Sequence, residues 1–201
     1  MHGLVNRSIQ CFVRDTYGLD LWGEVAAAIG IEPEGFEALF SYDDELTERM
    51  IATISERLHK PEAMVLEDVG TYLISNREAE AVRRLLRFGG DTFSELLNSL
   101  DDLPDRARLA VPDLEIPQLE VADGEDGILT LSVTGHPGFA CVLLGVLRAL
   151  ADDYGALVLM DLEESGADRS IILIRIFDSD FSEGRAFSLA NPSGASGRDG
   201  R

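Results

Sequence analysis

The sequence is short of basic residues. It has 17 lysines and arginines against 37 aspartates and glutamates in 201 residues, which gives a formal net charge of -20 at pH 7. A surface of this sign repels phosphate backbones and anionic lipid headgroups. We therefore expect neither nucleic acid nor a membrane surface as a partner.

Long apolar runs and paired cysteines are also lacking. No run reaches the ~18 consecutive apolar residues of a membrane span, and no basic region followed by an apolar one opens the chain. We expect a cytoplasmic protein. Cys11 and Cys141 lie far apart in the sequence and match neither a disulfide framework nor a zinc site, so we interpret them as small apolar core residues.

The residues needed for catalysis do not form a recognisable set. The three histidines His2, His59 and His136 are widely separated, and neither cysteine has a histidine nearby. The sequence contains no glycine-rich phosphate loop, nucleophile elbow or zinc-type helix pair. Acidic groups such as Asp43-Asp44-Glu45 and Asp101-Asp102 are typical of helix caps and solvated faces. The sequence therefore predicts that the protein is not an enzyme.

The residues that are present predict a helical first half. Apolar residues make up 45% of the chain and charged residues 27%, as in an ordinary globular domain. Up to about residue 111, apolar side chains recur at helical spacing. This pattern predicts helices over about 5–17, 21–29, 44–58 and 62–73, one that carries Val82, Leu85 and Leu86, and one that begins near Asp91.

After Pro112 and Pro117 the pattern changes to that of strands. It predicts a hairpin of 118–122 with 129–133, a helix from 139 to about 154, and strands over 156–160 and 171–177 with a polar turn over 163–168. The predicted fold class is α+β, a helical N-terminal lobe followed by a lobe with an antiparallel sheet and a helix. The end from about residue 191 lacks apolar anchors and is expected to be disordered.

Four segments in order carry a family resemblance. The chain opens with Met-His-Gly-Leu-Val-Asn, Tyr17-Gly18 is followed by Trp22, Tyr-Asp-Asp at 42–44 precedes a helix, and Leu-Asn-Ser-Leu-Asp-Asp-Leu at 97–103 leads into two prolines. Together they resemble the H-NOX family, the haem nitric oxide and oxygen binding domain. It occurs as a stand-alone bacterial sensor and as the sensory domain of soluble guanylate cyclase. The resemblance covers residues 1–180.

The resemblance implies one domain over 1–180 and a tail over 181–201. About 1–60 would form the N-terminal helical lobe, and 61–180 the pocket helices and a lobe with a four-stranded antiparallel sheet. In the family, haem lies between the lobes, and its axial histidine directly follows the Leu-Asp-x-Leu segment. Here that position is Pro104, whose nitrogen has no lone pair to give to iron. The usual proximal bond is therefore expected to be absent.

The family's Tyr-x-Ser-x-Arg motif, which holds the haem propionates, is also altered. By register with Pro137-Gly138, its places are taken by Ser132, Thr134 and His136. Thr134 keeps a hydroxyl, but Ser132 is too short to replace a phenol. His136 is mostly neutral at pH 7 and lacks the forked guanidinium that binds a carboxylate through two bonds.

Other positions match the apolar walls of the family's pocket. Pro117 matches the proline that presses on the porphyrin, while Val5 and Val142 match wall positions and are equally well explained as core residues. These positions leave three hypotheses open. The domain could signal without the usual haem bond, it could carry another apolar ligand, or it could bind haem through His2, His136 or Cys141.

By resemblance, the partner of a signalling module would be a histidine kinase or a cyclic-di-GMP enzyme. The acidic surface would favour a basic docking face on that partner. Pro104 also has a local consequence, because proline disfavours helical conformation at Leu103. We predict a helix break or a fresh helix start over 101–104, with Asp101 or Asp102 as its cap.

Overall fold

The computed structural model describes residues 1–76, 80–87, 89–124, 127–164, 168–178, 181 and 184. The first part of the chain is helical, as its apolar spacing predicts. It contains α1 (Gly3–Tyr17), α2 (Leu19–Ile29), α3 (Asp44–Leu58), α4 (Glu62–Ser75), α5 (Glu80–Arg87) and α6 (Phe93–Asn98). A short 3-10 helix, η2 (Leu100–Asp102), and then α7 (Leu103–Ala110) complete this part. None of the described helices is long and apolar enough to cross a membrane.

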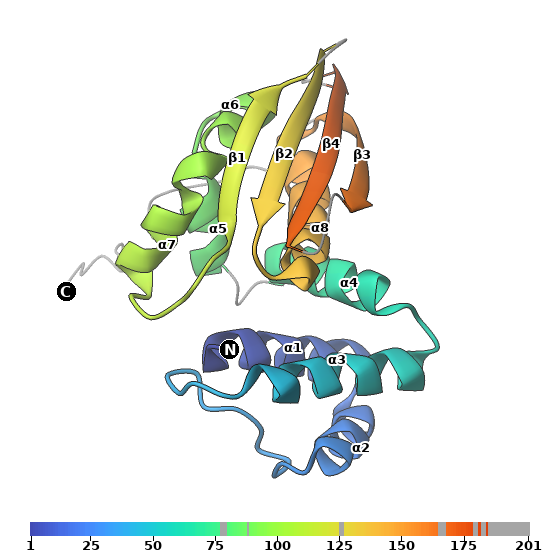
Figure 1. The fold of residues 1–201 in the computed structure, drawn as a ribbon. Helices are drawn as coiled ribbons and strands as arrows, with labels where there is room; N and C mark the ends of the chain where they lie inside the picture. Colours follow the sequence, from blue (N-terminus) through green and yellow to red (C-terminus); the bar gives the residue numbers. More distant parts are fainter. Residues whose placement is uncertain are drawn as a thin grey trace, which may run out of the picture.

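The second part forms a four-stranded antiparallel sheet with one long helix. Its elements are β1 (Gln118–Asp123), β2 (Ile128–Thr134), α8 (Pro137–Tyr154), β3 (Leu157–Glu164) and β4 (Arg169–Asp178). The strand order is β1-β2-β4-β3. Helix α8 covers one face of the sheet, and the face turned toward the viewer in Figure 1 carries no described helix. The predicted α+β class is confirmed.

Two hydrophobic clusters form the core. One lies among the N-terminal helices around Trp22, Met50 and Ile54, which are almost fully buried. The other lies between the sheet and α8, with α5, α6 and α7 along its side, as Figure 1 shows. Helix α4 belongs to both, because Val65 packs in the first cluster and Ile74 in the second.

The predicted polar turn over 163–168 is wrong at its beginning. Glu163 pairs with Ile171 and Glu164 with Ser170, so β3 continues through both acidic residues. Their side chains are polar, but the backbone pairing with β4 keeps these positions in the sheet. Residues 165–167, and the expected disordered end from about 191, lie outside the described residues.

Helices α4 and α8 touch through their backbones. A Cβ atom on Gly70 would overlap the carbonyl oxygen of Val142, and one on Gly145 would overlap the carbonyl oxygen of Glu67. Only glycine permits this approach, because any side chain at either position would push the two helices apart. The crossing therefore sets how the N-terminal lobe meets the sheet lobe.

We expect Gly145→Ala to lower the free energy of unfolding by about 2 kcal/mol, because overpacking of a tight core forces backbone shifts. Urea denaturation of the two proteins measures this difference. Gly23→Ala is the matched control, since Gly23 lies within α2 and a Cβ there meets nothing within 4 Å. It should be neutral or stabilising. Equal stability of Gly145→Ala and the parent protein would contradict the close approach.

Candidate functional site

The helix that would carry the axial ligand starts afresh at Pro104. The chain passes from α6 through η2 into α7, and Pro104 lies in the first turn of α7. Proline is favoured there because the first helical N–H groups have no partner within the helix. The predicted break over 101–104 is confirmed.

The predicted cap position is confirmed, but the side-chain bond expected of a cap is not formed. Asp102 occupies the N-cap position of α7 but makes no side-chain cap hydrogen bond. The Asp101 carboxylate instead accepts a hydrogen bond of 2.8 Å from the backbone N–H of Val121 in β1. This bond connects η2 to the edge strand β1. Capping rules consider only neighbouring residues in the sequence, so they do not predict a bond between Asp101 and Val121.

The predicted wall residues lie at the junction of the two lobes. Pro117 borders Gly135, whose added Cβ would lie 3.3 Å from the proline Cβ. Val142 packs against both core clusters, and Val5 packs against the N-terminal one. Pro104, Pro117, Val5 and Val142 are all half-buried.

The three predicted propionate positions are not brought together. Leu131 and Val133 point into the core, so strand alternation turns Ser132 and Thr134 to the opposite face of the sheet. There the Ser132 hydroxyl accepts a 2.7 Å hydrogen bond from Arg169, while Thr134 is exposed. The sequence pattern gave no indication of Arg169, because its partner follows from the pairing of β2 with β4.

His136 lies apart from that pair, at the N-cap position of α8. A Cβ added to Gly138 would lie 3.6 Å from the His136 ring and 3.0 Å from the end of Leu66. The half-buried His136 therefore sits beside α4, where the two lobes meet.

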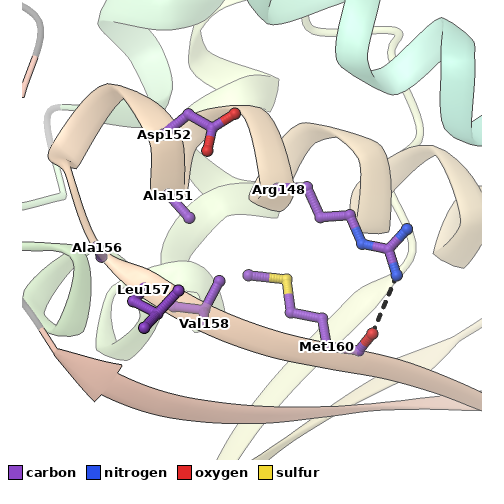
Figure 2. Close-up of a pocket in the computed structure, with 7 residues that line it drawn as sticks. All are labelled: Arg148, Ala151, Asp152, Ala156, Leu157, Val158 and Met160. Carbon is purple, nitrogen blue, oxygen red and sulfur yellow. Dashed lines mark hydrogen bonds between the residues drawn. The ribbon is translucent and has the colours of Figure 1, made fainter. Parts of the chain in front are cut away.

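The interior next to α7 is occupied by side chains. Leu103 of α7 and Leu119 of β1 are buried in the same cluster as Ala140 and Leu144 of α8. The most pronounced hollows of the described residues lie elsewhere. One of about 280 Å³ lies between α8 and β3, as Figure 2 shows, and one of about 480 Å³ borders the acidic stretch Tyr42–Glu45.

The residue at the position that the family resemblance assigns to the axial ligand does not fit that bond. Pro104 offers no nitrogen lone pair. His2 Nδ1 accepts a 3.1 Å hydrogen bond from the backbone N–H of Leu4 as the cap of α1. His59 ends α3 in the left-handed conformation. Among the described residues, no three His, Cys, Asp or Glu side chains are grouped as a metal site would require.

The N-terminus forms a charged contact that the sequence did not reveal. The Met1 ammonium group donates to the Asp44 carboxylate and to the Tyr42 carbonyl oxygen, the latter at 2.6 Å. The hydrogen bond from the ammonium, and then its charge, lower the pKa of Asp44. Asp43 or Asp44 was expected to cap this helix. Asp43 occupies the N-cap position of α3 without a side-chain cap bond, and the Asp44 carboxylate binds the Met1 ammonium group.

Acetylation of the N-terminus should raise the pKa of Asp44 toward its ordinary value of 3.8. The lowered pKa gives a stabilisation that is present above the ordinary value and is lost as the pH falls through the folded value. Carboxyl NMR titration of the acetylated and free proteins measures the change. An unchanged Asp44 titration in the acetylated protein would contradict the contact.

Helix α5 is held to the end of α8 by two arginines. Arg83 forms an ion pair with Asp153, which is only 1% exposed, and the Arg87 guanidinium lies 4.4 Å from the centre of the Tyr154 ring. The Tyr154 hydroxyl donates a 2.8 Å hydrogen bond to the Gly90 carbonyl oxygen. Burial raises the pKa of Tyr154. These long-range contacts position the helices next to α7.

Arg83→Met should destabilise the fold by about 2 kcal/mol, because it removes one charged partner of a buried carboxylate. Arg108→Met is the control, since Arg108 and Asp105 form an exposed pair whose loss should cost less than about 0.5 kcal/mol. Thermal and urea denaturation of both variants test the difference. Equal effects of the two substitutions would show that the Arg83–Asp153 pair is not a structural contact.

The family model described as Haem-NO-binding matches residues 2–161. Among curated proteins, the chain is 21% identical over 155 residues to soluble guanylate cyclase 89Db of Drosophila melanogaster. This match covers 77% of the chain and 23% of the relative. The chain is also 24% identical over 200 residues to soluble guanylate cyclase gcy-31 of Caenorhabditis elegans. That match covers 96% of the chain and 28% of the relative. The chain thus spans about a quarter of these relatives.

Among solved structures, a single-site variant of the H-NOX protein of T. Tengcongensis matches with a TM-score of 0.75. The sequence identity is 19%, and the match covers 89% of this chain and 99% of that one. At this identity the likeness establishes the fold.

Proposed function

Because the chain belongs to the haem-NO-binding family, a family of gas-sensing domains, we propose that it is a non-enzymatic signalling domain that works without the usual axial haem bond. The single observation that carries this proposal is Pro104 in the first turn of α7, where the resemblance requires a histidine. A tertiary amide nitrogen cannot bind iron. The domain therefore needs either another ligand residue or no haem at all.

The packing around α7 supports a domain that does not depend on haem. Leu103, Leu119 and Leu144 belong to one core cluster, so the inner side of α7 packs against apolar side chains of β1 and α8. A void of porphyrin size would be costly, at about 24 cal/mol per Å³ of cavity. Stability without haem is a requirement for a domain that has lost the axial bond.

The propionate positions support the same proposal. The Ser132 hydroxyl is bound to Arg169, and Thr134 faces solvent, so neither is held ready for a carboxylate beside Pro117. The domain would then signal by direct contact with another protein. We propose a signalling partner, such as a histidine kinase or a cyclic-di-GMP enzyme, with a basic face that complements the net charge of -20.

Absorption spectroscopy after expression with excess haem tests the proposal. We expect the parent protein to lose its Soret band on gel filtration, whereas Pro104→His should retain more haem because it restores an axial nitrogen. Pro104→Ala is the matched control, since it removes the proline ring without adding a ligand.

Two results would contradict the proposal. A stoichiometric Soret band that persists in the parent protein would show haem held by another residue, and Ala substitutions at His2, His136 and Cys141 would identify it. An apolar molecule other than haem, found at one equivalent by mass spectrometry of extracts from native protein, would instead show a carrier.

A further inference from the structure

Strand β3 leaves one side of the sheet open. It lies at the end of the order β1-β2-β4-β3 and pairs only with β4 among the described strands. The opposite edge is covered, because η2 and α7 contact β1 and the Asp101 carboxylate binds the Val121 N–H. An open edge presents backbone donors and acceptors that an extended chain can pair with.

The outer face of this edge carries exposed apolar side chains. Leu159 on β3 is 52% exposed, and Phe177 on β4 is 59% exposed. Leu157, at the start of β3, is 40% exposed and lines the groove between β3 and α8, because the strand register shifts between Leu157 and Val158. Met160, in contrast, points toward α8 and is buried. The face that carries Leu159 is the one without a described helix in Figure 1. Apolar groups gathered at a strand edge are typical of an interaction surface.

The inner side of the same edge is hollowed. The groove of about 280 Å³ lies between α8 and β3, with Ala151 and Asp152 on the helix side and Val158 and Met160 on the strand side. Figure 2 shows Arg148 at one end, donating a 3.0 Å hydrogen bond to the Met160 carbonyl oxygen. The edge therefore has an apolar outer side and a groove on its inner side.

The charge along β3 changes from one end to the other. On the outer face, Leu159 is followed by the exposed Asp161 and Glu163. A basic residue on an added strand would complement these two carboxylates. A second copy would not, because antiparallel pairing centred on Met160 would place each Asp161 opposite the other copy's Leu159 and bring together two chains of charge -20.

We propose that the open edge of β3 binds an extended, apolar and basic segment of a partner protein as a fifth strand. This inference rests on the proposed function, because it assumes that the domain signals by binding a partner protein. Running antiparallel to β3, the segment places basic residues opposite Glu163 and Asp161 and apolar residues opposite Leu159 and Leu157. Its alternate side chains enter the groove. Backbone pairing supplies affinity, and the side chains supply specificity.

The Arg148 guanidinium donates to the Met160 carbonyl oxygen, which is the acceptor that a backbone N–H of the added strand would use. The guanidinium also forms an ion pair with Glu67 of α4, so it keeps a partner when the Met160 carbonyl oxygen accepts from the added strand instead. Binding of the strand breaks the hydrogen bond from Arg148 to the Met160 carbonyl oxygen and forms a backbone hydrogen bond to the same oxygen. No rearrangement of the core is needed for the strand to bind.

A fluorescein-labelled peptide of the order Arg-Thr-Arg-Val-Val-Val-Val tests the proposal with the full chain. We expect saturable binding by fluorescence anisotropy and slower amide hydrogen exchange in β3. Asp161→Lys with Glu163→Lys should weaken binding about tenfold, since two attractive pairs become repulsive. The matched control is Glu120→Lys with Asp123→Lys on β1, which changes the net charge equally and should leave the affinity unchanged.

A peptide N-methylated at alternate backbone nitrogens separates strand addition from simple charge attraction, and it should not bind. Equal binding of this peptide, equal weakening by the β1 control, or no binding at millimolar concentration would each overturn the proposal. Concentration-dependent dimers that Asp161→Lys with Glu163→Lys alters would overturn it in favour of a second copy. Since haem plays no part, failure here is distinguishable from failure of the haem test.

Discussion

The backbone contact between α4 and α8 is the constraint on which the two lobes depend. Gly70 and Gly145 each allow a carbonyl oxygen of the other helix to approach where a Cβ would stand. Helix α4 contributes Val65 to the N-terminal cluster and Ile74 to the cluster beneath the sheet. A change in the crossing would therefore disturb both cores together, because close-packed interiors transmit displacement instead of absorbing it.

The fold does not need an axial ligand at position 104 to form. Leu103 and Ala107 anchor α7 in the core, and proline is well suited to the first turn of a helix. A histidine there would serve iron binding rather than helix stability. A chain can therefore keep the family's fold when the residue at position 104 differs from the one that the resemblance implies, since function resides in sites that a fold carries.

Much of the architecture follows from periodicity in the sequence. The spacing of apolar residues located the helices and strands, because burial of one face imposes a period of 3.6 or 2 residues. The break before Pro104 followed from proline's covalent geometry. Asp43 and Asp102 occupy the expected N-cap positions, but neither makes a side-chain cap bond. The neighbouring Asp44 and Asp101 instead bind the Met1 ammonium group and the Val121 N–H. Rules for helix caps consider only residues close in the sequence, so they do not predict that a distant group binds the neighbouring carboxylate.

The amino-acid sequence alone was enough to predict the α+β class and the start of a helix at Pro104, and it shows that residue 104 has no side-chain donor for a metal. Each is a property of one residue or of a short repeating pattern. Only the packed chain shows that Ser132 binds Arg169, that Asp101 binds the β1 edge and that β3, among the described strands, pairs on one side only. These depend on pairing between segments distant in the chain, and pairing of that kind is set by the packing of the whole domain.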